Sequence, residues 1–178
     1  LKKIQKKKFN NEVKWISNFD QIKKGPVIFF GNEFFDAIPI KQFKKDKNFL
    51  LEKKYFLDKN FRIKEFFKKA SISDIKAIRN YKSLSKLNFI EFPKLGLREL
   101  GKITKKIVKL NGCILLVDYG YQKPNNENTL QSVINHQRNN LLDNLGKADV
   151  TAHVNFSLLN EFFLKNNLKI KNLITQKE

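Results

Sequence analysis

An amphipathic helix that leads directly into an apolar strand is the feature that most constrains the fold of this chain. Between residues 95 and 110, apolar side chains recur at steps of three and four, as they do on one face of a helix. Asn111 and Gly112 form a typical helix end, and residues 113–118 are predicted to be a buried strand. Because a helix followed by an apolar strand is half of a parallel crossover unit, the pattern favours an α/β fold with a doubly wound sheet.

A second apolar run supplies another strand of the expected sheet. Residues 26–30 are continuously apolar between Gly25 and Gly31, which predicts a central strand that is buried on both faces. The lone cysteine, Cys113, lies in the other apolar run, so we expect a buried small hydrophobic residue and not a nucleophile. A single cysteine forms no internal disulfide, which favours a reducing compartment.

The rest of the chain shows no repeat and no linker, so residues 1–178 are expected to form a single domain. Residues 42–67 are short aromatic segments broken by turn residues, which is typical of an antiparallel insertion. With a strand expected at 87–92, this inserted segment spans approximately 42–92. Residues 71–74 favour no particular state. The remaining expected elements are helices at 1–9 and 156–163 and strands at 13–16 and 168–174.

The formal net charge of +19 does not by itself indicate a nucleic-acid-binding protein. Specific recognition of bases and phosphates favours arginine, yet nearly all the basic residues here are lysines scattered along the chain. The only arginines are Arg62, Arg79, Arg98 and Arg138. A basic nucleic-acid-binding module is therefore the weakest alternative. No apolar run approaches the roughly 20 residues that cross a bilayer, so no membrane insertion is expected.

Two polar clusters directly follow the two apolar strands and are the candidate sites. They are residues 31–39, Gly-Asn-Glu-Phe-Phe-Asp-Ala-Ile-Pro, and residues 118–121, Asp-Tyr-Gly-Tyr. Ligands of open α/β sheets bind beyond the carboxyl ends of the strands. Glu33 and Asp36 bracket two phenylalanines that we expect to point into the core, and two carboxylates in such a frame suit a guanidinium or ammonium group. Each could equally be an ordinary turn residue or helix cap.

The other candidate residues carry a weaker signal. Tyr119 and Tyr121 suit packing against an adenine or a cationic group, or ordinary packing at a strand end. His153 and His136 accompany no serine or cysteine in a recognisable nucleophile motif. With two histidines and one cysteine in all, a zinc site built from these residues is excluded, and no metal site is expected. The chain also has neither a G-x-G-x-x-G turn nor a Walker A loop.

Four ordered blocks lie between residues 32 and 156. They are Asn-Glu-Phe-Phe-Asp-Ala-Ile-Pro at 32–39, Leu-Val-Asp-Tyr-Gly-Tyr at 116–121, Thr-Leu-Gln at 129–131 with His136, and Ala-Asp-Val-Thr-Ala-His-Val-Asn-Phe at 148–156. Together they resemble the MidA family of class I S-adenosylmethionine-dependent methyltransferases. Gly31 and Ile38 replace a common Ala and Leu of that family. Asn155 stands where the family usually has Asp.

The resemblance implies a Rossmann-like methyltransferase fold with S-adenosylmethionine as the cofactor. Glu33 occupies the place of the glutamate that orients the substrate after the fourth strand, and Asp36 is the candidate for a second such carboxylate. Asn32 is implied to touch the cofactor. The residues expected to bind substrate are Asp118, Tyr119, Tyr121 and His153.

The family includes a mitochondrial protein-arginine methyltransferase that modifies a core subunit of respiratory complex I. The resemblance thus implies methylation of a protein substrate on arginine, in the cytoplasm or, for a eukaryotic source, in the mitochondrial matrix. The strands with the cofactor loop would precede Leu1, so we expect a C-terminal portion that by itself is inactive. A non-catalytic assembly factor that holds the same client is the alternative.

Overall fold

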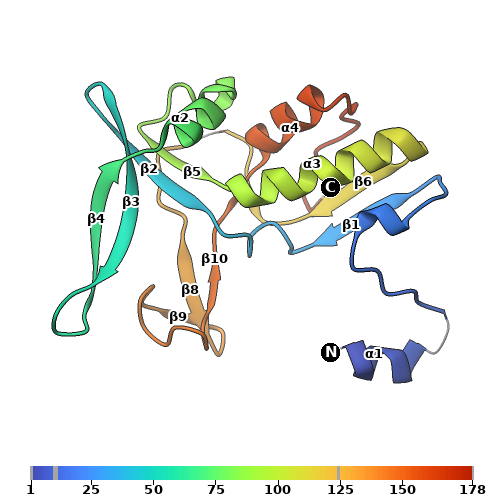
Figure 1. The fold of residues 1–178 in the computed structure, drawn as a ribbon, viewed down its shortest axis with the longest axis horizontal. Helices are drawn as coiled ribbons and strands as arrows, with labels where there is room; N and C mark the ends of the chain where they lie inside the picture. The colour runs from blue at the N-terminus through green and yellow to red at the C-terminus, as the bar shows by residue number, and fades with distance from the viewer. Residues whose placement is uncertain (1, 10–11, 124, 178) are drawn as a thin grey trace.

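Two parallel strands and one long helix form the unit that the strongest sequence pattern predicts. The computed structural model describes residues 2–9, 12–123 and 125–177. In it, β1 (Ile28–Asn32) pairs in parallel with β6 (Cys113–Val117), and the connection between them ends in α3 (Lys94–Leu110) (Figure 1). The predicted helix-to-strand succession is therefore confirmed.

The chain after α3 passes so close to the residue before β1 that position 112 must be a glycine. Asn111, and not Gly112, takes the left-handed conformation at the end of α3, with φ 52°. A Cβ on Gly112 would lie 2.2 Å from the carbonyl oxygen of Val27, so this glycine is required for space.

The expectation that β1 and β6 are buried on both faces is wrong. Ile28 is 75% exposed and Phe30 is 61% exposed, and their register partners Cys113 and Leu115 are exposed as well. These residues share one face of the two-stranded sheet, whereas Phe29 and its neighbours on the other face pack against the core. Among the described residues only that second face is covered, so half of each apolar run remains open to solvent.

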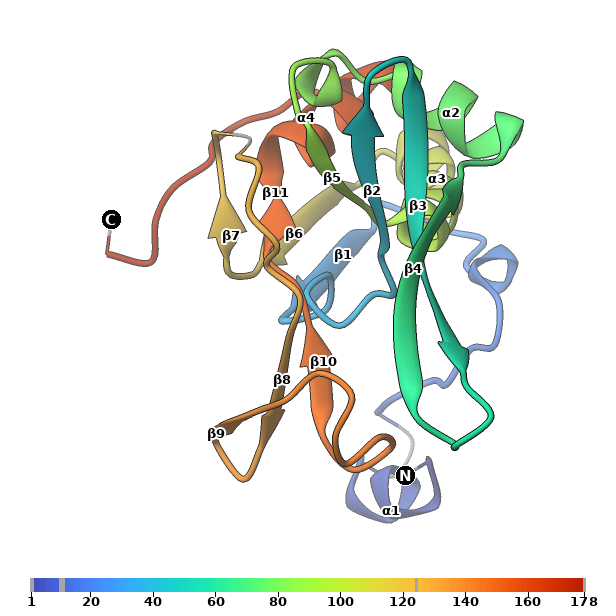
Figure 2. The same cartoon turned by 90° about the vertical axis from the view of Figure 1, so that its left-hand side faces the viewer.

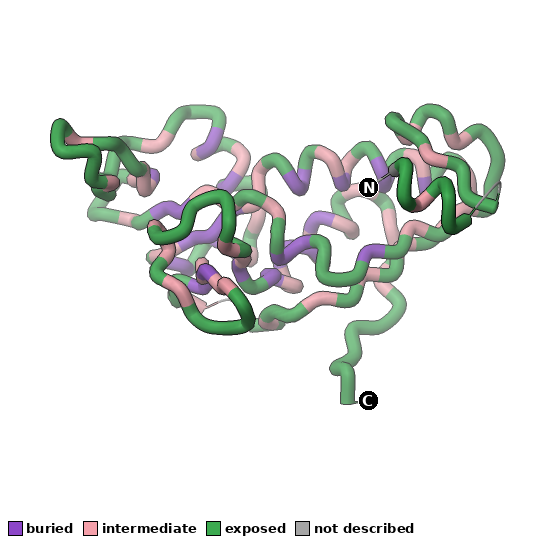
Figure 3. The backbone as a smooth tube through the Cα atoms, turned by 90° about the horizontal axis from the view of Figure 1, so that it is seen from below, coloured by how far each residue is buried: buried purple, intermediate pink, exposed green. Residues whose placement is uncertain are grey.

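The predicted antiparallel strands are confirmed as a sheet of four strands in the order β4-β3-β2-β5. Buried side chains of this sheet, including Phe43 and Ile90, meet Leu100 of α3 and Leu158 of the last helix in one core. Figure 3 shows the buried residues gathered toward the middle of the molecule. The strands are β2 (Lys41–Asp46), β3 (Phe49–Leu57), β4 (Ile63–Lys69) and β5 (Phe89–Phe92).

The segment at 71–74, for which the sequence favoured no state, begins a helix. Ser71 is the N-cap of α2 (Ile72–Arg79), and its hydroxyl oxygen accepts a hydrogen bond from the backbone N–H of Asp74 at 3.1 Å. A serine followed three residues later by an acid is a known helix-start pattern. The sequence therefore held the signal for α2.

The remaining elements include two small sheets that the sequence did not predict. β7 and β11 pair in parallel, and β8, β9 and β10 form an antiparallel arm. This arm and the β3–β4 hairpin extend away from α2, α3 and α4 (Figure 2). The elements are α1 (Lys2–Phe9), η1 (Phe19–Gln21), η2 (Lys82–Leu84), β7 (Gly120–Tyr121), β8 (Gln131–Ile134), β9 (Gln137–Asn139), β10 (Asp149–Thr151), β11 (Val154–Asn155) and α4 (Phe156–Lys165).

Two expected strands are wrong. Residues 13–16 and 168–174 have no regular structure, because no strand among the described residues pairs with them. Alternation of apolar side chains does not make a strand without a partner. The expected helices at 1–9 and 156–163 are confirmed as α1 and α4, although Leu1 lies outside the described residues. No helix within the described ranges is long and apolar enough to span a bilayer.

A buried carboxylate ties α2 to the antiparallel sheet. Asp74 is 1% exposed, and it accepts hydrogen bonds from Lys94 Nζ at 2.6 Å, Ser71 Oγ at 2.7 Å and Lys41 Nζ at 2.9 Å. Burial raises the pKa of this carboxyl, but the hydrogen bonds from Lys94, Ser71 and Lys41 outweigh burial and hold the pKa well below its ordinary value. Asp74 is thus a charged anchor of the fold.

Replacing Asp74 by alanine should lower the free energy of unfolding by about 3 kcal/mol at pH 7, because two ammonium groups lose a buried partner. Since the folded-state pKa is depressed, the stabilisation is fully present above about pH 4, the ordinary value, and is lost as the pH falls below it. The difference between wild type and variant should therefore narrow at pH 3 in urea denaturation of the full-length protein. Asp20→Ala, which removes an exposed ion pair to Lys106, is the control and should change little.

Candidate functional site

The two polar clusters meet at the carboxyl ends of the two parallel strands. Asn32 lies opposite Val117 at the end of the β1–β6 pairing, and the backbone N–H of Glu33 donates to the carbonyl oxygen of Val117 at 2.8 Å. Parallel strands end at the same edge of a sheet, so the two clusters, predicted as separate candidate sites, lie together.

Asp118 holds the loop that follows β1. Its Oδ2 accepts hydrogen bonds from the backbone N–H groups of Phe35 at 2.8 Å, Phe34 at 3.2 Å and Asp36 at 3.3 Å. Its Oδ1 accepts from the backbone N–H of Tyr119 at 2.9 Å. The pKa of Asp118 lies above its ordinary value. Burial raises it most, the hydrogen bond from Phe35 lowers it, and the charge of Asp36 raises it further. Both oxygens are engaged by backbone, so direct contact of Asp118 with a substrate stays a prediction.

Asp36 is a buried carboxylate with spare hydrogen-bonding capacity. It is 6% exposed, and its Oδ2 accepts a hydrogen bond from the Tyr119 hydroxyl at 2.7 Å. Its Oδ1 is buried and has no hydrogen-bond partner among the described residues. Buried polar atoms are nearly always satisfied, so an orphaned carboxylate oxygen indicates a donor from outside these residues.

Glu33 differs from Asp36 in its surroundings. It is exposed, its carboxylate has no hydrogen-bond partner in the described part of the chain, and its backbone is left-handed with φ 44°. A non-glycine residue in that region is strained and is often found at functional sites. The expectation that both phenylalanines point into the core is wrong for Phe34, which is 50% exposed, because consecutive residues of this turn face opposite ways. Phe35 is buried as predicted.

The carboxylate beside Asp36 is therefore Asp118, which was expected to bind substrate. Glu33, Asp36 and Asp118 form no ion pair with any lysine, arginine or histidine among the residues that the structure describes. In a chain of net charge +19, the strand ends thus carry three carboxylates that form no ion pair with a described basic residue. We call these three residues the acidic cluster.

Tyr119 and His153 lie together next to the acidic cluster. Their rings are 5.5 Å apart and nearly perpendicular, and the His153 side chain is exposed. The pKa of Tyr119 lies above its ordinary value. Burial raises it most, side-chain hydrogen bonding with Thr151 lowers it, and the hydrogen bond to Asp36 raises it again. Gln131 donates to Thr151 Oγ1 at 3.2 Å, so two residues that the sequence analysis did not single out border this tyrosine. The expected substrate contacts of Tyr119 and His153 stay predictions.

Tyr121 faces a small enclosed cavity. The cavity has a volume of about 20 Å³ and is lined by Tyr121, His153, Asn155 and Glu91, among others. Burial, and next the charge of Glu91, raise the pKa of Tyr121 to about 12. A space of this size holds about one water molecule. Tyr121 is better placed to support the site than to touch a large ligand, and its expected substrate contact stays a prediction.

A buried network behind the site was missed by sequence reasoning. Glu91 accepts hydrogen bonds from Gln42 Nε2 at 2.8 Å and from the backbone N–H of Thr129 at 3.1 Å, and also from the Thr129 hydroxyl. Thr129 Oγ1 accepts in turn from the backbone N–H of His153 at 3.0 Å. Glu91 therefore links the antiparallel sheet to the turn that carries His153. The only sequence signal was an acid inside an apolar strand pattern, at 87–92.

An open hollow adjoins the acidic cluster on the β1 side. It has a volume of about 650 Å³ and is lined by Phe30, Gly31, Asn32 and Phe34 together with residues of α3. Asn32 is exposed at the strand end, where its amide is free to meet a ligand. Asn32, the one residue expected to touch the cofactor, lines this hollow, and its contact with a cofactor stays a prediction.

Comparisons with known proteins agree with the motifs. Residues 1–174 match the family described as "Putative S-adenosyl-L-methionine-dependent methyltransferase". The chain is 33% identical over 150 residues to "Protein arginine methyltransferase NDUFAF7 homolog, mitochondrial" of Caenorhabditis elegans, which covers 82% of this chain and 34% of that protein. It is 26% identical over 145 residues to "Protein arginine methyltransferase NDUFAF7, mitochondrial" of Danio rerio, with the same two coverages of 82% and 34%. The chain thus spans about a third of the length of the curated relatives it matches.

Solved structures share the fold. An uncharacterised protein from Burkholderia thailandensis superposes with a TM-score of 0.72 at 17% identity, over 94% of this chain and 47% of that chain. A second structure from the same organism, bound to S-adenosyl-homocysteine, superposes with a TM-score of 0.69 at 17% identity, over 92% and 43% of the two chains. The fold is that of a methyltransferase with parallel and antiparallel sheets. Both its motifs and its family match show that the chain belongs to the MidA family of S-adenosylmethionine-dependent methyltransferases.

Proposed function

We propose that this chain forms the substrate-facing part of an S-adenosylmethionine-dependent methyltransferase that acts on an arginine of a protein. The observation that carries the proposal is the acidic cluster, Glu33, Asp36 and Asp118, which lacks basic partners among the described residues of a strongly basic chain. A guanidinium is a planar cation with several donors, and carboxylates are the groups that bind it best. The two curated relatives above are named protein arginine methyltransferases.

The residues present fit one side of a nucleotide-like cofactor. Asn32 is exposed beside an open hollow at the carboxyl end of β1, which is where open α/β sheets bind such ligands. The chain, which spans about a third of the length of its curated relatives, has no glycine-rich turn of its own. When bound, S-adenosylmethionine supplies a methyl group on a sulfonium.

The protein's contribution to the reaction is mainly positioning, because methyl transfer needs an aligned nucleophile and little other help. Exposed Glu33 is proposed to orient the guanidinium and to localise its positive charge away from the attacking nitrogen. Asp36 offers its orphaned Oδ1 as a second acceptor, while the Tyr119 hydroxyl holds the other oxygen in place. Asp118 keeps the loop in the shape that aims both carboxylates.

The client follows from the family resemblance. We propose an arginine in a core subunit of respiratory complex I, with residues 42–92 facing that client. Because the relatives are named mitochondrial proteins, the mitochondrial matrix is the proposed location for a eukaryotic source and the cytoplasm for a bacterial one.

The test is methyl transfer from radiolabelled S-adenosylmethionine to a soluble lysate by the full-length protein and its Glu33→Gln variant. Wild type should label a protein band on arginine. The variant should lose about 100-fold in rate, as expected when a charge that stabilises the transition state is removed, while binding S-adenosyl-homocysteine normally. Glu12→Gln, at an exposed acid remote in sequence from the site, is the matched control.

Two outcomes would count against this proposal. If Glu33→Gln labels as well as wild type, Glu33 is a turn residue without a part in the reaction. If neither protein labels any band although both bind S-adenosylmethionine, the protein is a non-catalytic assembly factor that holds its client.

A further inference from the structure

A second cavity lies in the antiparallel part of the molecule. It has a volume of about 410 Å³ and sits between the β2–β3 turn, the end of β4 and α2. Figure 1 shows these elements at the opposite end of the molecule from β1, whose end carries Glu33. The volume falls within the range of about 300–1,000 Å³ that is usual for small-molecule sites.

The floor of this cavity is apolar and belongs to the core. Its deepest residues, Ile78, Leu84 and Ile90, are 6%, 1% and 0% exposed, so a ligand would meet the apolar residues above them. Phe49 and Ile75 extend the apolar lining toward the opening. A hydrocarbon group placed here would be removed from water on several sides, which favours its binding.

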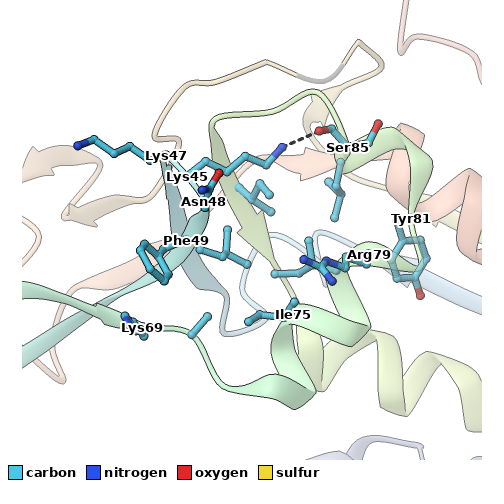
Figure 4. A pocket seen from close by; sticks show the side chains of 14 residues that line it. Lys45, Lys47, Asn48, Phe49, Lys69, Ile75, Arg79, Tyr81 and Ser85 are labelled. Carbon is cyan, nitrogen blue, oxygen red and sulfur yellow. Dashed lines mark hydrogen bonds between the residues drawn. The ribbon is translucent and has the colours of Figure 1, made fainter.

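The rim of the cavity is cationic. Four of the lining residues are basic and none is acidic. Lys45 Nζ donates to the carbonyl oxygen of Ser85 at 2.5 Å, and Lys69 Nζ lies 4.2 Å from the centroid of the Phe49 ring. Figure 4 shows Lys69 and Arg79 on opposite sides of the apolar lining, whereas Lys47 points away from it.

No carboxylate neutralises the two flanking cations. Neither Lys69 nor Arg79 forms an ion pair with any aspartate or glutamate among the described residues. An apolar floor between two such cations, with no acid in the lining, is complementary to a molecule that has a hydrocarbon body and an anionic end.

We propose that this cavity binds a small amphiphilic carboxylate, with its hydrocarbon part against Phe49, Leu50 and Ile75 and its carboxylate paired with Arg79, while Lys69 on the other side of the lining adds positive charge to the rim. The site is separate from the acidic cluster and does not depend on the proposed methyl transfer. An arginine fork holds a carboxylate through two parallel hydrogen bonds, and Arg79 is therefore the main anchor.

One other ligand class fits less well. An acidic protein segment would need a wide surface, whereas most of this lining is apolar and converges on a buried floor. A small amphiphilic carboxylate suits both the apolar lining and the cationic rim.

Isothermal titration calorimetry of the full-length protein with octanoate tests the proposal, with 1-octanol as the uncharged probe. Octanoate should bind, and 1-octanol should bind about tenfold more weakly, because its neutral hydroxyl forms no ion pair and no bidentate contact with Arg79. Arg79→Ala should weaken octanoate by a similar factor. Lys47→Ala is the matched control: it removes a lining cation that points away, and should change the affinity less than about twofold.

A second variant tests the space inside the cavity without changing a charge. Ala70→Leu puts a larger side chain into the lining and fills part of the cavity, so it should abolish octanoate binding, provided that circular dichroism and thermal melting show an intact fold. The proposal is overturned if octanoate does not bind, if octanol binds equally well, or if Arg79→Ala and Lys47→Ala have the same effect. It is also overturned if an acidic peptide with one leucine binds in an Arg79-dependent way and octanoate does not, since the cavity is then a protein docking site.

Discussion

Replacing Asp118 by alanine is expected to lower methyl transfer by the full-length protein about 100-fold, a loss that a displacement of about 1 Å in the reacting groups can cause. The reason is that this one carboxylate accepts hydrogen bonds from four backbone N–H groups, those of Phe34, Phe35, Asp36 and Tyr119. Without it the loop that carries Glu33 and Asp36 loses its fixed shape. The measurement is the steady-state rate with labelled S-adenosylmethionine, alongside the free energy of unfolding, which should fall by about 2 kcal/mol.

The matched control is Asp149→Ala, which removes an exposed aspartate from β10 and should leave the rate unchanged. Binding of S-adenosyl-homocysteine should weaken much less than the rate in Asp118→Ala, because the loop positions the substrate side. If the rate of Asp118→Ala falls only as far as its cofactor binding falls, the loop does not position catalytic groups. The assignment of Glu33 and Asp36 as the groups that orient the guanidinium then fails as well.

The second large effect is expected at Gly120, whose replacement by alanine should destabilise the protein by about 3 kcal/mol. A Cβ at this position would lie 2.0 Å from the carbonyl oxygen of Val154 and 2.8 Å from two further backbone atoms of that residue. Gly120 pairs with Val154 where β7 meets β11, so the clash pushes apart the two strands that carry Tyr121 and Asn155. Guanidinium denaturation of the full-length protein, followed by circular dichroism, measures the loss.

Gly101→Ala is the contrasting variant. Gly101 lies inside α3, and its added Cβ would meet only Phe162 Cζ, at 3.9 Å. Because alanine is a better helix former than glycine by about 1 kcal/mol, this substitution should stabilise the protein. Equal destabilisation by both variants would contradict the steric reading of Gly120, since backbone entropy favours alanine at both positions.

The candidate site could be located from the sequence, but its internal contacts could not. Each polar cluster was predicted at a strand end, and the structure shows that both lie at one edge of the parallel sheet. Which carboxylates are neighbours depends on how the loop turns. The sequence paired Glu33 with Asp36 because they are three residues apart, whereas the structure places Asp36 beside Asp118 and Tyr119, more than 80 residues later.

Burial was the other quantity that local pattern could not determine. Apolar runs at 26–30 and 113–117 have the composition of strands covered on both sides, yet Phe30 and Leu115 are exposed. The composition of a strand records the surroundings it is suited to, whereas its exposure depends on which other elements pack against it. Conversely, Glu91 and Asp74 are charged residues that are buried because partners distant in sequence satisfy their oxygens.

By itself, the sequence determined the helix-to-strand unit, the antiparallel strands, the family and the place of the candidate site, because these follow from periodicity and from short motifs. Only the tertiary structure decided that Asp118 holds the loop, that Asp36 retains an orphaned oxygen, that Glu91 supports the turn with His153, and that cations flank an apolar cavity beside α2. The physical reason is that hydrogen bonds and burial depend on distances between residues far apart in the chain, and those distances exist only once the elements are packed.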